Sequence, residues 1–198
     1  MSVALTPVRY DPADPTTDVR NIVRDPKYSD ALILFNDNFE DRNTPLPGGN
    51  AAVVRPFVFE HPCRVVGVST GWSTSDGGYV TLGDDEKLAI TLDFERVNTA
   101  LHLNDKLRRV VYFCGTDRRE LGFSIFRPHP TVAKFINEKL RSVTKRFMTG
   151  APVSILALDM AENIVESRRM RRRPQLDKRA YKSFLVKNKI RQHSRLYG

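Results

Sequence analysis

Three stretches of this chain combine the residue types that bind phosphates and hydroxyl groups. The first is Asn36-Asp37-Asn38, the second is Gly48-Gly49-Asn50, and the third runs from Ser69-Thr70-Gly71 to Asp76-Gly77-Gly78. Paired glycines let backbone N–H groups surround a phosphate, and adjacent hydroxyl groups add donors. The three stretches therefore indicate a site for a phosphate-bearing ligand, although each of them taken singly is also an ordinary turn former.

Two kinds of side chain would complete such a site. Arg55 could make a charge-assisted contact to a phosphate, and Asp37 or Asp76 could hold a ribose hydroxyl or orient a water molecule. The chain has no Walker-type Gly-Lys-Ser/Thr motif and no Gly-x-Gly-x-x-Gly, which argues against ordinary P-loop and Rossmann dinucleotide sites. No histidine stands at a suggestive position beside a nucleophile, so the residues leave open whether the protein is an enzyme.

The end of the chain carries the positive charge. Residues 168–198, the basic segment, contain 12 Lys and Arg against one acid, Asp177, which gives a net charge of +11. The other 167 residues contain 20 Lys and Arg against 22 acids, which gives −2 and agrees with the total of +9. The chain is therefore a near-neutral body followed by a polycationic segment, and the two parts need separate functional explanations.

A nucleic acid is the partner that we predict for the basic segment. Arg and Lys neutralise phosphates and release counterions, and interleaved aromatic residues such as Tyr181 and Phe184 can stack on unpaired bases. A solvated helix face, an anionic membrane surface and an acidic protein are the alternatives. We favour DNA or RNA because arginine dominates residues 168–173, RRMRRR, and the donor fork of its guanidinium group matches phosphate oxygens. The predicted contacts are Arg168, Arg169, Arg171, Arg172, Arg173, Lys178, Arg179, Lys182, Lys187, Lys189, Arg191 and Arg195.

Composition limits the class of protein. With 40% hydrophobic and 28% charged residues, the body can bury a core. The apolar runs are too short to span a bilayer and the start of the chain has no signal-peptide pattern, so we expect a cytoplasmic protein, or one inside a virion if a phage encodes it. Cys63 and Cys114 are expected to be buried free thiols. Neither the cysteines nor the four histidines have metal-ligand spacing, so we expect no metal and no resident cofactor.

The elements that must position the three stretches follow from the apolar pattern. Residues 1–30 are rich in Pro and Asp and predict an extended arm that lies on the surface or on a neighbouring chain. Short apolar or alternating runs predict strands, the second of them a short edge strand, at Ala31–Phe35, Val53–Glu60, Arg64–Val68, Arg109–Cys114 and Leu121–Phe126.

Helices are predicted between and after these strands. The predicted ranges are about 84–103, 131–147, from Pro152 into 168–173, and 178–190. In the first of them the acids of the first turn suit the helix dipole. Its residues 88, 90, 92 and 94 alternate as a strand would, but its length and the later apolar positions Val97 and Leu101 favour a helix.

This order predicts an α/β domain over residues 31–150, with an N-terminal arm over 1–30 and a basic helical extension over 151–198. In open α/β sheets, ligands bind in the loops at the carboxyl ends of the strands. The three stretches follow predicted strands. We therefore expect them to lie at one edge of the sheet.

Six segments of the chain follow one another in a recognisable order. They are ILFNDN at 33–38, PGGNAAVVRP at 47–56, VVGVSTGW at 65–72, Gly77-Gly78-Tyr79, VVYFCGTD at 110–117 and LGFSIF at 121–126. In this order they resemble a poorly characterised family of small bacterial and phage proteins with macrodomain-like glycine-rich loops. The resemblance implies a macro-like sheet of two or three layers with flanking helices, and a loop that cradles the diphosphate of ADP-ribose. The chain departs from the pattern at Leu121-Gly122-Phe123-Ser124 and at Ser69.

Two functions are compatible with the sequence. The first is a nucleic-acid-associated binding or structural protein, in which the basic segment contacts phosphates and the body is a degenerate nucleotide-binding fold. The second, implied by the resemblance, is a macrodomain-like protein that binds or hydrolyses ADP-ribose or another nucleotide metabolite. We predict the first, because the late Gly-x-Gly is missing and no convincing catalytic base is present.

Overall fold

The computed structural model describes residues 3–11, 13–42, 49–60, 62–73, 78–114, 128–146 and 155–172, and of some of these it describes only the backbone. By contacts the chain divides into two units, Met1–Glu162 and Asn163–Gly198. The second unit is described only as far as residue 172, as the continuation of a helix. The fold below is that of the first unit.

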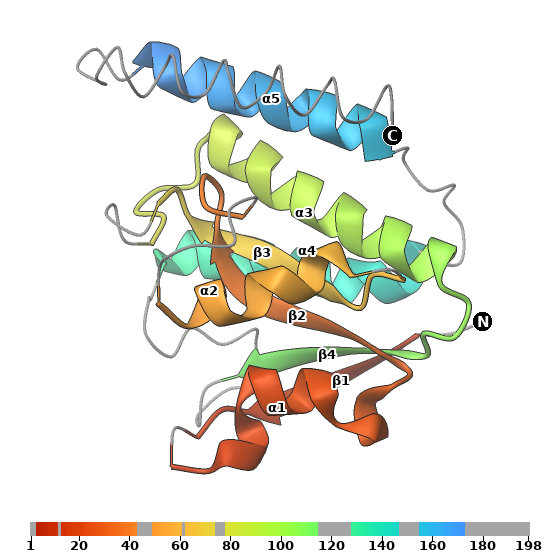
Figure 1. The fold of residues 1–198 in the computed structure, drawn as a ribbon. Coiled ribbons are helices and arrows are strands. Elements are labelled where there is room, and N and C mark those ends of the chain that lie inside the picture. Colours follow the sequence, from red (N-terminus) through yellow and green to blue (C-terminus); the bar gives the residue numbers. More distant parts are fainter. Residues whose placement is uncertain are drawn as a thin grey trace. The chain divides into compact units, whose positions relative to one another are not determined.

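Four parallel strands form one sheet in the order β1-β4-β2-β3 (Figure 1). The fold class is therefore α/β, as predicted. The strands are β1 (Ala4–Arg9), β2 (Ala31–Asn38), β3 (Val65–Gly71) and β4 (Arg109–Cys114).

Helices flank this sheet, with α2 in front of it and α4 behind it in Figure 1. The α-helices are α1 (Val19–Arg24), α2 (Gly49–Val54), α3 (Asp84–Leu103), α4 (Pro130–Arg146) and α5 (Ile155–Arg172). The short 3-10 helices are η1 (Pro15–Thr17), η2 (Pro26–Tyr28) and η3 (Arg55–Phe59). Among the described residues, no helix combines the length and the apolar character needed to cross a membrane.

The central strand β2 explains why the sheet is covered on both faces. Its residues 31–35 are all buried, as is typical of a strand inside a parallel sheet. Because side chains alternate between faces, Ile33 and Phe35 enter a cluster with Ile22 of α1 and Val54 of α2. The neighbouring positions 32 and 34 enter the larger cluster, which contains residues of α3 and α4.

The helix predicted at 84–103 is confirmed as α3. Its first turn contains three acids, and the Glu86 carboxylate accepts a hydrogen bond of 2.9 Å from the backbone N–H of Gly83. Apolar residues of α3 contact the sheet, while polar residues on another face are buried as well, including Asp93 and Asn98. Two buried faces blur the helical period, which is why its sequence also alternates like a strand.

The N-terminal residues are not a free arm. Residues 4–9 form the edge strand β1, which pairs in parallel with β4 from Ala4↔Arg109 to Arg9↔Cys114. Pro7 is tolerated there because an edge strand has one side without ladder hydrogen bonds. The prediction of an extended arm over 1–30 is therefore wrong for this segment, and its binding partner is the protein's own sheet.

Two other predicted elements differ from the structure. Residues 53–60, predicted as an edge strand, end α2 and form η3, because Pro56 fits the first turn of a helix and Arg55 must turn inward. Both polar stretches predicted as loops after β2 and β3 are still strand, since backbone pairing between Asp37 and Ser69 does not depend on side-chain polarity. The predicted strand at 121–126 and the helix at 178–190 lie outside the described residues.

Candidate functional site

The carboxyl ends of β2 and β3 lie side by side. Asp37 is in register with Ser69, and a bulge between Asp37 and Asn38 then places Asn38 opposite Gly71. A bulge re-aims the side chains next to it, and strand ends of this kind are where α/β proteins build ligand sites. We call this end of the sheet the carboxyl edge.

A buried ion pair joins Asp37 to Arg55 at this edge. The Nη2 and Nε atoms of Arg55 lie 2.5 Å and 2.9 Å from the same Asp37 oxygen, Oδ1. That oxygen also accepts the backbone N–H of Asn38 at 2.8 Å. The Arg55 side chain is 0% exposed and that of Asp37 is 2% exposed, so neither charge is solvated by water. Asp37 therefore fixes the position of the Arg55 guanidinium.

The Asp37 carboxylate packs closely against Gly67 of β3. A Cβ atom on Gly67 would lie 2.8 Å from Asp37 Oδ2 and 3.1 Å from the ring of Phe35. Burial raises the pKa of Asp37, and the hydrogen bonds and charge of Arg55 oppose that rise. Arg42 is near enough to lower this pKa as well. The two arginines and Asp37 are thus one electrostatic unit.

A second buried ion pair joins Arg42, just after β2, to Asp93 of α3. The Arg42 Nη1 atom lies 2.6 Å from Asp93 Oδ1, and the other oxygen of Asp93 accepts the backbone N–H of Ser69 at 2.7 Å. Burial raises the pKa of Asp93 to about 6, against the opposing effects of Arg42 and Ser69. Asp93 thereby ties the end of β3 to the start of the segment after β2.

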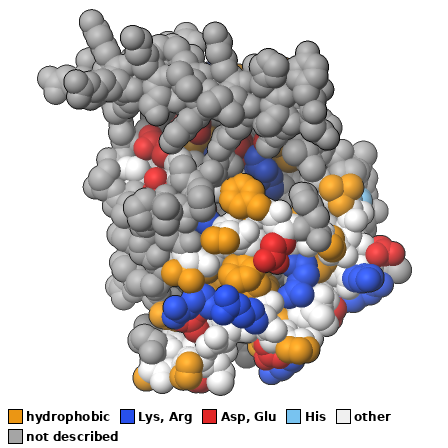
Figure 2. All heavy atoms as spheres, in the orientation of Figure 1, with side chains coloured by type: hydrophobic (Ala, Val, Ile, Leu, Met, Phe, Trp, Pro, Cys, Tyr) orange, Lys and Arg blue, Asp and Glu red, His pale blue; other side chains and the backbone are white. Residues whose placement is uncertain are grey.

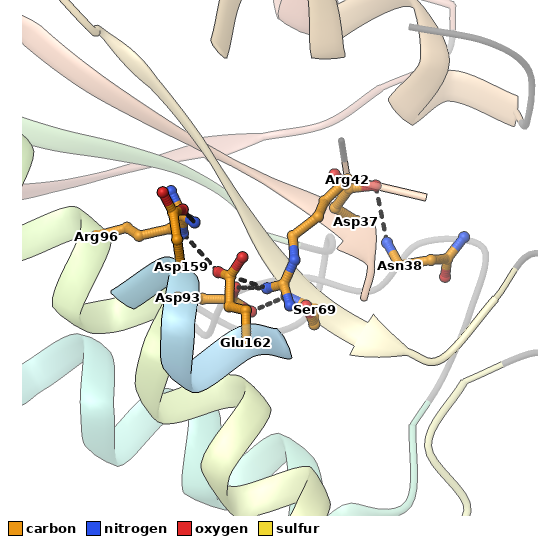
Figure 3. Close-up of polar contacts among 8 residues, drawn as sticks. All are labelled: Asp37, Asn38, Arg42, Ser69, Asp93, Arg96, Asp159 and Glu162. Atoms are coloured by element: carbon orange, nitrogen blue, oxygen red, sulfur yellow. Dashed lines mark hydrogen bonds and ion pairs between the residues drawn. The ribbon is translucent and has the colours of Figure 1, made fainter. Parts of the chain in front are cut away.

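Acids from the first half of α5 extend this network (Figure 3). Glu162 Oε1 lies 2.7 Å from Arg96 Nε and 3.4 Å from Arg42 Nη1, while Asp159 Oδ1 lies 2.9 Å from Arg96 Nη2. Arg96 and Asp93 are three residues apart on α3 and therefore share one face of that helix. The result is a row of alternating charges from the carboxyl edge to α5.

Several polar atoms at the carboxyl edge are buried without a partner. Of the eight such side-chain atoms among the described residues, six belong to this cluster. They are Arg42 Nε, Arg42 Nη2, Arg55 Nη1, Asp37 Oδ2, Ser69 Oγ and Tyr79 Oη. The Ser69 hydroxyl is near enough to the Asp93 carboxyl and the Tyr79 hydroxyl to lower the pKa of both, so the arginine nitrogens and Asp37 Oδ2 are the clearest cases. Buried polar groups are normally hydrogen-bonded, so a concentration of exceptions calls for an explanation. The three arginine nitrogens are donors only, and a group rich in acceptor oxygens would satisfy them.

Aromatic side chains close one side of the cluster. The Arg42 guanidinium stacks on the ring of Phe39, with 3.4 Å between its carbon and the ring centroid. Trp72 meets Phe39 and Tyr79 edge to face, at centroid distances of 5.5 Å and 5.0 Å, and its Nε1–H donates to Glu86. Trp72 therefore packs against other aromatic rings. Burial raises the pKa of the Tyr79 hydroxyl well above its usual value.

The structure brings most of the predicted ligand-binding residues to one edge. The residues that lie there are Asn36, Asp37, Asn38, Arg55, Ser69, Thr70 and Gly71. Gly78 is close by, since the next residue, Tyr79, donates its backbone N–H to the carbonyl of Thr70 at 2.7 Å. Gly49 and Asn50 open α2 instead of forming a loop, and the side chain of Asn50 is not described. Gly48, Asp76 and Gly77 lie outside the described residues.

Most of the basic segment is not described. Arg168 lies in α5 and is exposed, and positions 169, 171 and 172 belong to the same helix with side chains that are not described. The other predicted nucleic-acid contacts, from Arg173 to Arg195, lie outside the described residues.

The sequence prediction missed five charged residues of the site: Arg42, Asp93, Arg96, Asp159 and Glu162. Arg42 and its partner Asp93 are 51 residues apart in the sequence, and Arg96 and its partner Glu162 are 66 residues apart. No local sequence pattern can therefore reveal these pairs. One signal was present. Asp93 stands between Leu92 and Phe94, where a charge is unexpected on a buried helix face.

Other chemistry-bearing side chains have structural roles. His129 directly precedes α4, and its Nδ1 lies 2.8 Å from Thr131 Oγ1 in the first turn of that helix. Neither Cys63 nor Cys114 is in a disulfide. Cys114 is buried, as predicted, whereas Cys63 is only partly buried, and this burial raises the pKa of Cys63. Within the described ranges, no three His, Cys, Asp or Glu side chains are grouped so that they could hold a metal ion.

The surface on the α2 side mixes apolar and basic side chains (Figure 2). Val53 and Phe59 are 45% and 51% exposed, and the Arg24 guanidinium lies 5.5 Å from the ring centroid of Phe57. Exposed apolar residues of this kind are common on soluble proteins and indicate no specific partner.

Comparison with known proteins gives no assignment, since no family model, no curated protein and no solved structure matches the chain.

Proposed function

We propose that the carboxyl edge of the sheet binds a phosphate-bearing ligand of nucleotide type. The observation that carries this proposal is the Nε and Nη2 pair of Arg42, which is buried and has no hydrogen-bond partner among the described residues. These two nitrogens form the fork of a guanidinium group, whose parallel N–H bonds match two oxygens of a phosphate or carboxylate. Arg42 is held in place by Asp93 and Phe39, so its fork is preorganised.

Neighbouring groups support a phosphate more than a simple carboxylate. Arg55 Nη1 adds a further buried donor, and the hydroxyl groups of Ser69 and Tyr79 can donate or accept. The site lies at the carboxyl ends of parallel strands, the usual ligand position in α/β sheets. The resemblance to macrodomain-like proteins points to ADP-ribose as the nucleotide to test first. As part of the same proposal, the sheet and its helices would be layered as in a macrodomain.

Binding to the full-length protein tests the proposal. Calorimetric titrations with ADP-ribose, ADP and inorganic pyrophosphate should give a saturable signal for at least one of them. An Arg42→Lys variant keeps the charge beside Asp93 but loses the fork, and its affinity should fall by roughly tenfold or more.

The matched control is Arg109→Lys, because Arg109 is also paired with an acid but lies at the opposite end of the sheet. Its affinity should equal that of the wild type. Absence of binding for all three compounds, or equal affinities of the wild type and the Arg42→Lys variant, would contradict the proposal. Ordered water would then account for the unpaired arginine nitrogens.

A second function is favoured by the charge distribution of the chain. The basic segment, residues 168–198, has a net charge of +11 beside a body of −2, which suits sequence-independent contact with nucleic-acid phosphates. Exchange of Arg171, Arg172 and Arg173 for glutamine in the full-length chain should reduce the salt dependence of binding to mixed-sequence DNA or RNA, with a slope lower by about two to three. An unchanged slope would exclude these arginines as contacts.

A further inference from the structure

The acids of α5 occupy the arginines that an anionic ligand would use. Glu162 Oε1 lies between two guanidinium groups, 2.7 Å from Arg96 Nε and 3.4 Å from Arg42 Nη1. Figure 3 shows Glu162 between Arg96 on one side and Arg42 on the other. Charge-assisted hydrogen bonds from arginine to an oxyanion are among the strongest that proteins use to bind anions. Here the anion is part of the chain itself.

This carboxylate is too buried to be a surface ion pair. The side chain of Glu162 is 6% exposed and that of Arg42 is 8% exposed. Asp159 stands one helical turn before Glu162 and binds the adjacent nitrogen of the Arg96 guanidinium, Nη2, at 2.9 Å. The two acids therefore form one negatively charged turn, which faces the arginines from α5.

A phosphate on the fork of Arg42 would meet this negative turn. Arg42 binds Asp93 and Glu162 through Nη1, while the proposed ligand would bind Nε and Nη2 of the same guanidinium. Like charges on two sides of one buried guanidinium repel each other strongly, because little water screens them. Asp93 lies 2.6 Å from Arg42 and also accepts a hydrogen bond from the backbone N–H of Ser69. Glu162 lies farther from Arg42, at 3.4 Å. Glu162 is thus the acid that can give way.

We infer that the acidic turn of α5, Asp159 and Glu162, is an internal competitor that holds Arg42 and Arg96 until a phosphate-bearing ligand displaces Glu162 from Arg42. This inference rests on the proposed function. The turn lowers the affinity for anions and selects ligands whose phosphate interacts with Arg42 strongly enough to displace a carboxylate. It also predicts that ligand binding loosens the first half of α5.

The test measures pyrophosphate and ADP-ribose binding to the full-length protein. Glu162→Gln removes the charge but keeps an oxygen that accepts from Arg96, so the fold should survive. Its affinity for both compounds should rise by roughly tenfold, within the usual range of coupling between sites. Asp159→Asn is the second variant, with a smaller increase expected because Asp159 forms its ion pair with Arg96 and not with Arg42, on which the proposed ligand binds.

Asp30→Asn is the matched control. It removes one acid that is paired with an arginine, Arg109, at the opposite end of the sheet, so it reports the effect of net charge alone. Its affinity should equal that of the wild type. Hydrogen exchange supplies an independent readout: saturating pyrophosphate should speed exchange in peptides that cover residues 155–162.

The outcomes separate the inference from the proposed function. If the wild type binds and both α5 variants bind equally well or more weakly, the acidic turn is structural and the inference fails while the proposed function stands. If neither the wild type nor any variant binds either compound, both fail. Tighter binding by Glu162→Gln but not by Asp30→Asn supports both.

Discussion

The two ends of the sheet place arginines in opposite circumstances. At the amino end, Arg109 begins β4 and binds Asp30 Oδ1 through Nε at 2.9 Å and through Nη2 at 2.6 Å. Its Nη2 also donates to the carbonyl of Lys27, and the Arg109 and Asp30 side chains are 25% and 41% exposed. At the carboxyl end, Arg42 and Arg55 are almost fully buried and keep donors without a described partner.

This difference separates a partly exposed arginine that joins two segments of the fold from buried arginines that, under our proposal, bind a ligand. Arg109 joins a strand to the segment that precedes β2, in contact with water, where an ion pair contributes little to stability. Arg42 and Arg55 are removed from water together with their acids, and such pairs seldom stabilise a fold more than apolar side chains would. Stability alone therefore does not explain this buried pair with unused donors, and under our proposal those donors serve ligand binding.

The largest expected effect comes from breaking the pair at the carboxyl edge. Replacing Arg55 by Met leaves the buried Asp37 carboxylate without its partner and should lower the free energy of unfolding by about 3–5 kcal/mol, measured by urea denaturation. The double variant Asp37→Asn with Arg55→Met should recover at least half of this loss. If Arg55→Met alone lowered the free energy of unfolding by no more than about 1 kcal/mol, as for a surface ion pair, then water would reach the carboxyl edge.

The pH dependence of stability should reveal Asp93. Its pKa in the folded protein is about 6, above the value near 4 of an unfolded chain. The folded state therefore holds this proton more tightly, and the resulting stability is full below about pH 4 and is lost as the pH rises through about 6. Relative to Asp93→Asn, the wild type should gain on the order of 2–3 kcal/mol when the pH falls from 7 to 4.

Urea denaturation at a series of pH values measures this gain. An Asp30→Asn variant measured alongside shows how much of the pH dependence follows from removing any carboxylate. If the difference between the wild type and Asp93→Asn is the same at all pH values, then Asp93 does not change its protonation state in this range.

The smallest effect is expected at the amino end. Replacing Arg109 by Met removes a half-exposed ion pair with Asp30 and should lower the free energy of unfolding by no more than about 1 kcal/mol. Added salt should weaken the pair further, since exposed charges are screened. A loss as large as that for Arg55 would remove the contrast between the two ends.

Local pattern was enough to predict several of the helices and strands but not the charged network. The apolar run at 31–35, the acidic start of α3 and the strand at 109–114 each contain their own signal, and the structure confirms all three. Arg55 was singled out by its charge after a glycine-rich stretch, and it does reach the carboxyl edge. Arg42 and Glu162 were not predicted as site residues. Tertiary packing decides which distant segments form an ion pair, and the residues next to each partner in the sequence do not reveal it.

Register also limited the sequence reading. The strand prediction stopped at the first polar residue, Asn36, whereas β2 continues through Asn38 because the backbone of β3 offers hydrogen bonds to the same point. The N-terminal strand was missed for a related reason: six residues with a proline and mixed exposure show no alternation strong enough to predict β1. The backbone hydrogen bonds to β4 stabilise β1 as a strand even though its own sequence has no strand pattern.

That pairing also constrains how the chain can fold during synthesis. Ala4 is in register with Arg109, so β1 must wait until more than a hundred further residues have left the ribosome before its partner exists. β2 and β3 can pair earlier, but closing the loop between β1 and β4 is entropically the most demanding step in the sheet. We expect β1 to dock last, and nascent chains that end before residue 109 to expose the unpaired side of β2 to chaperones.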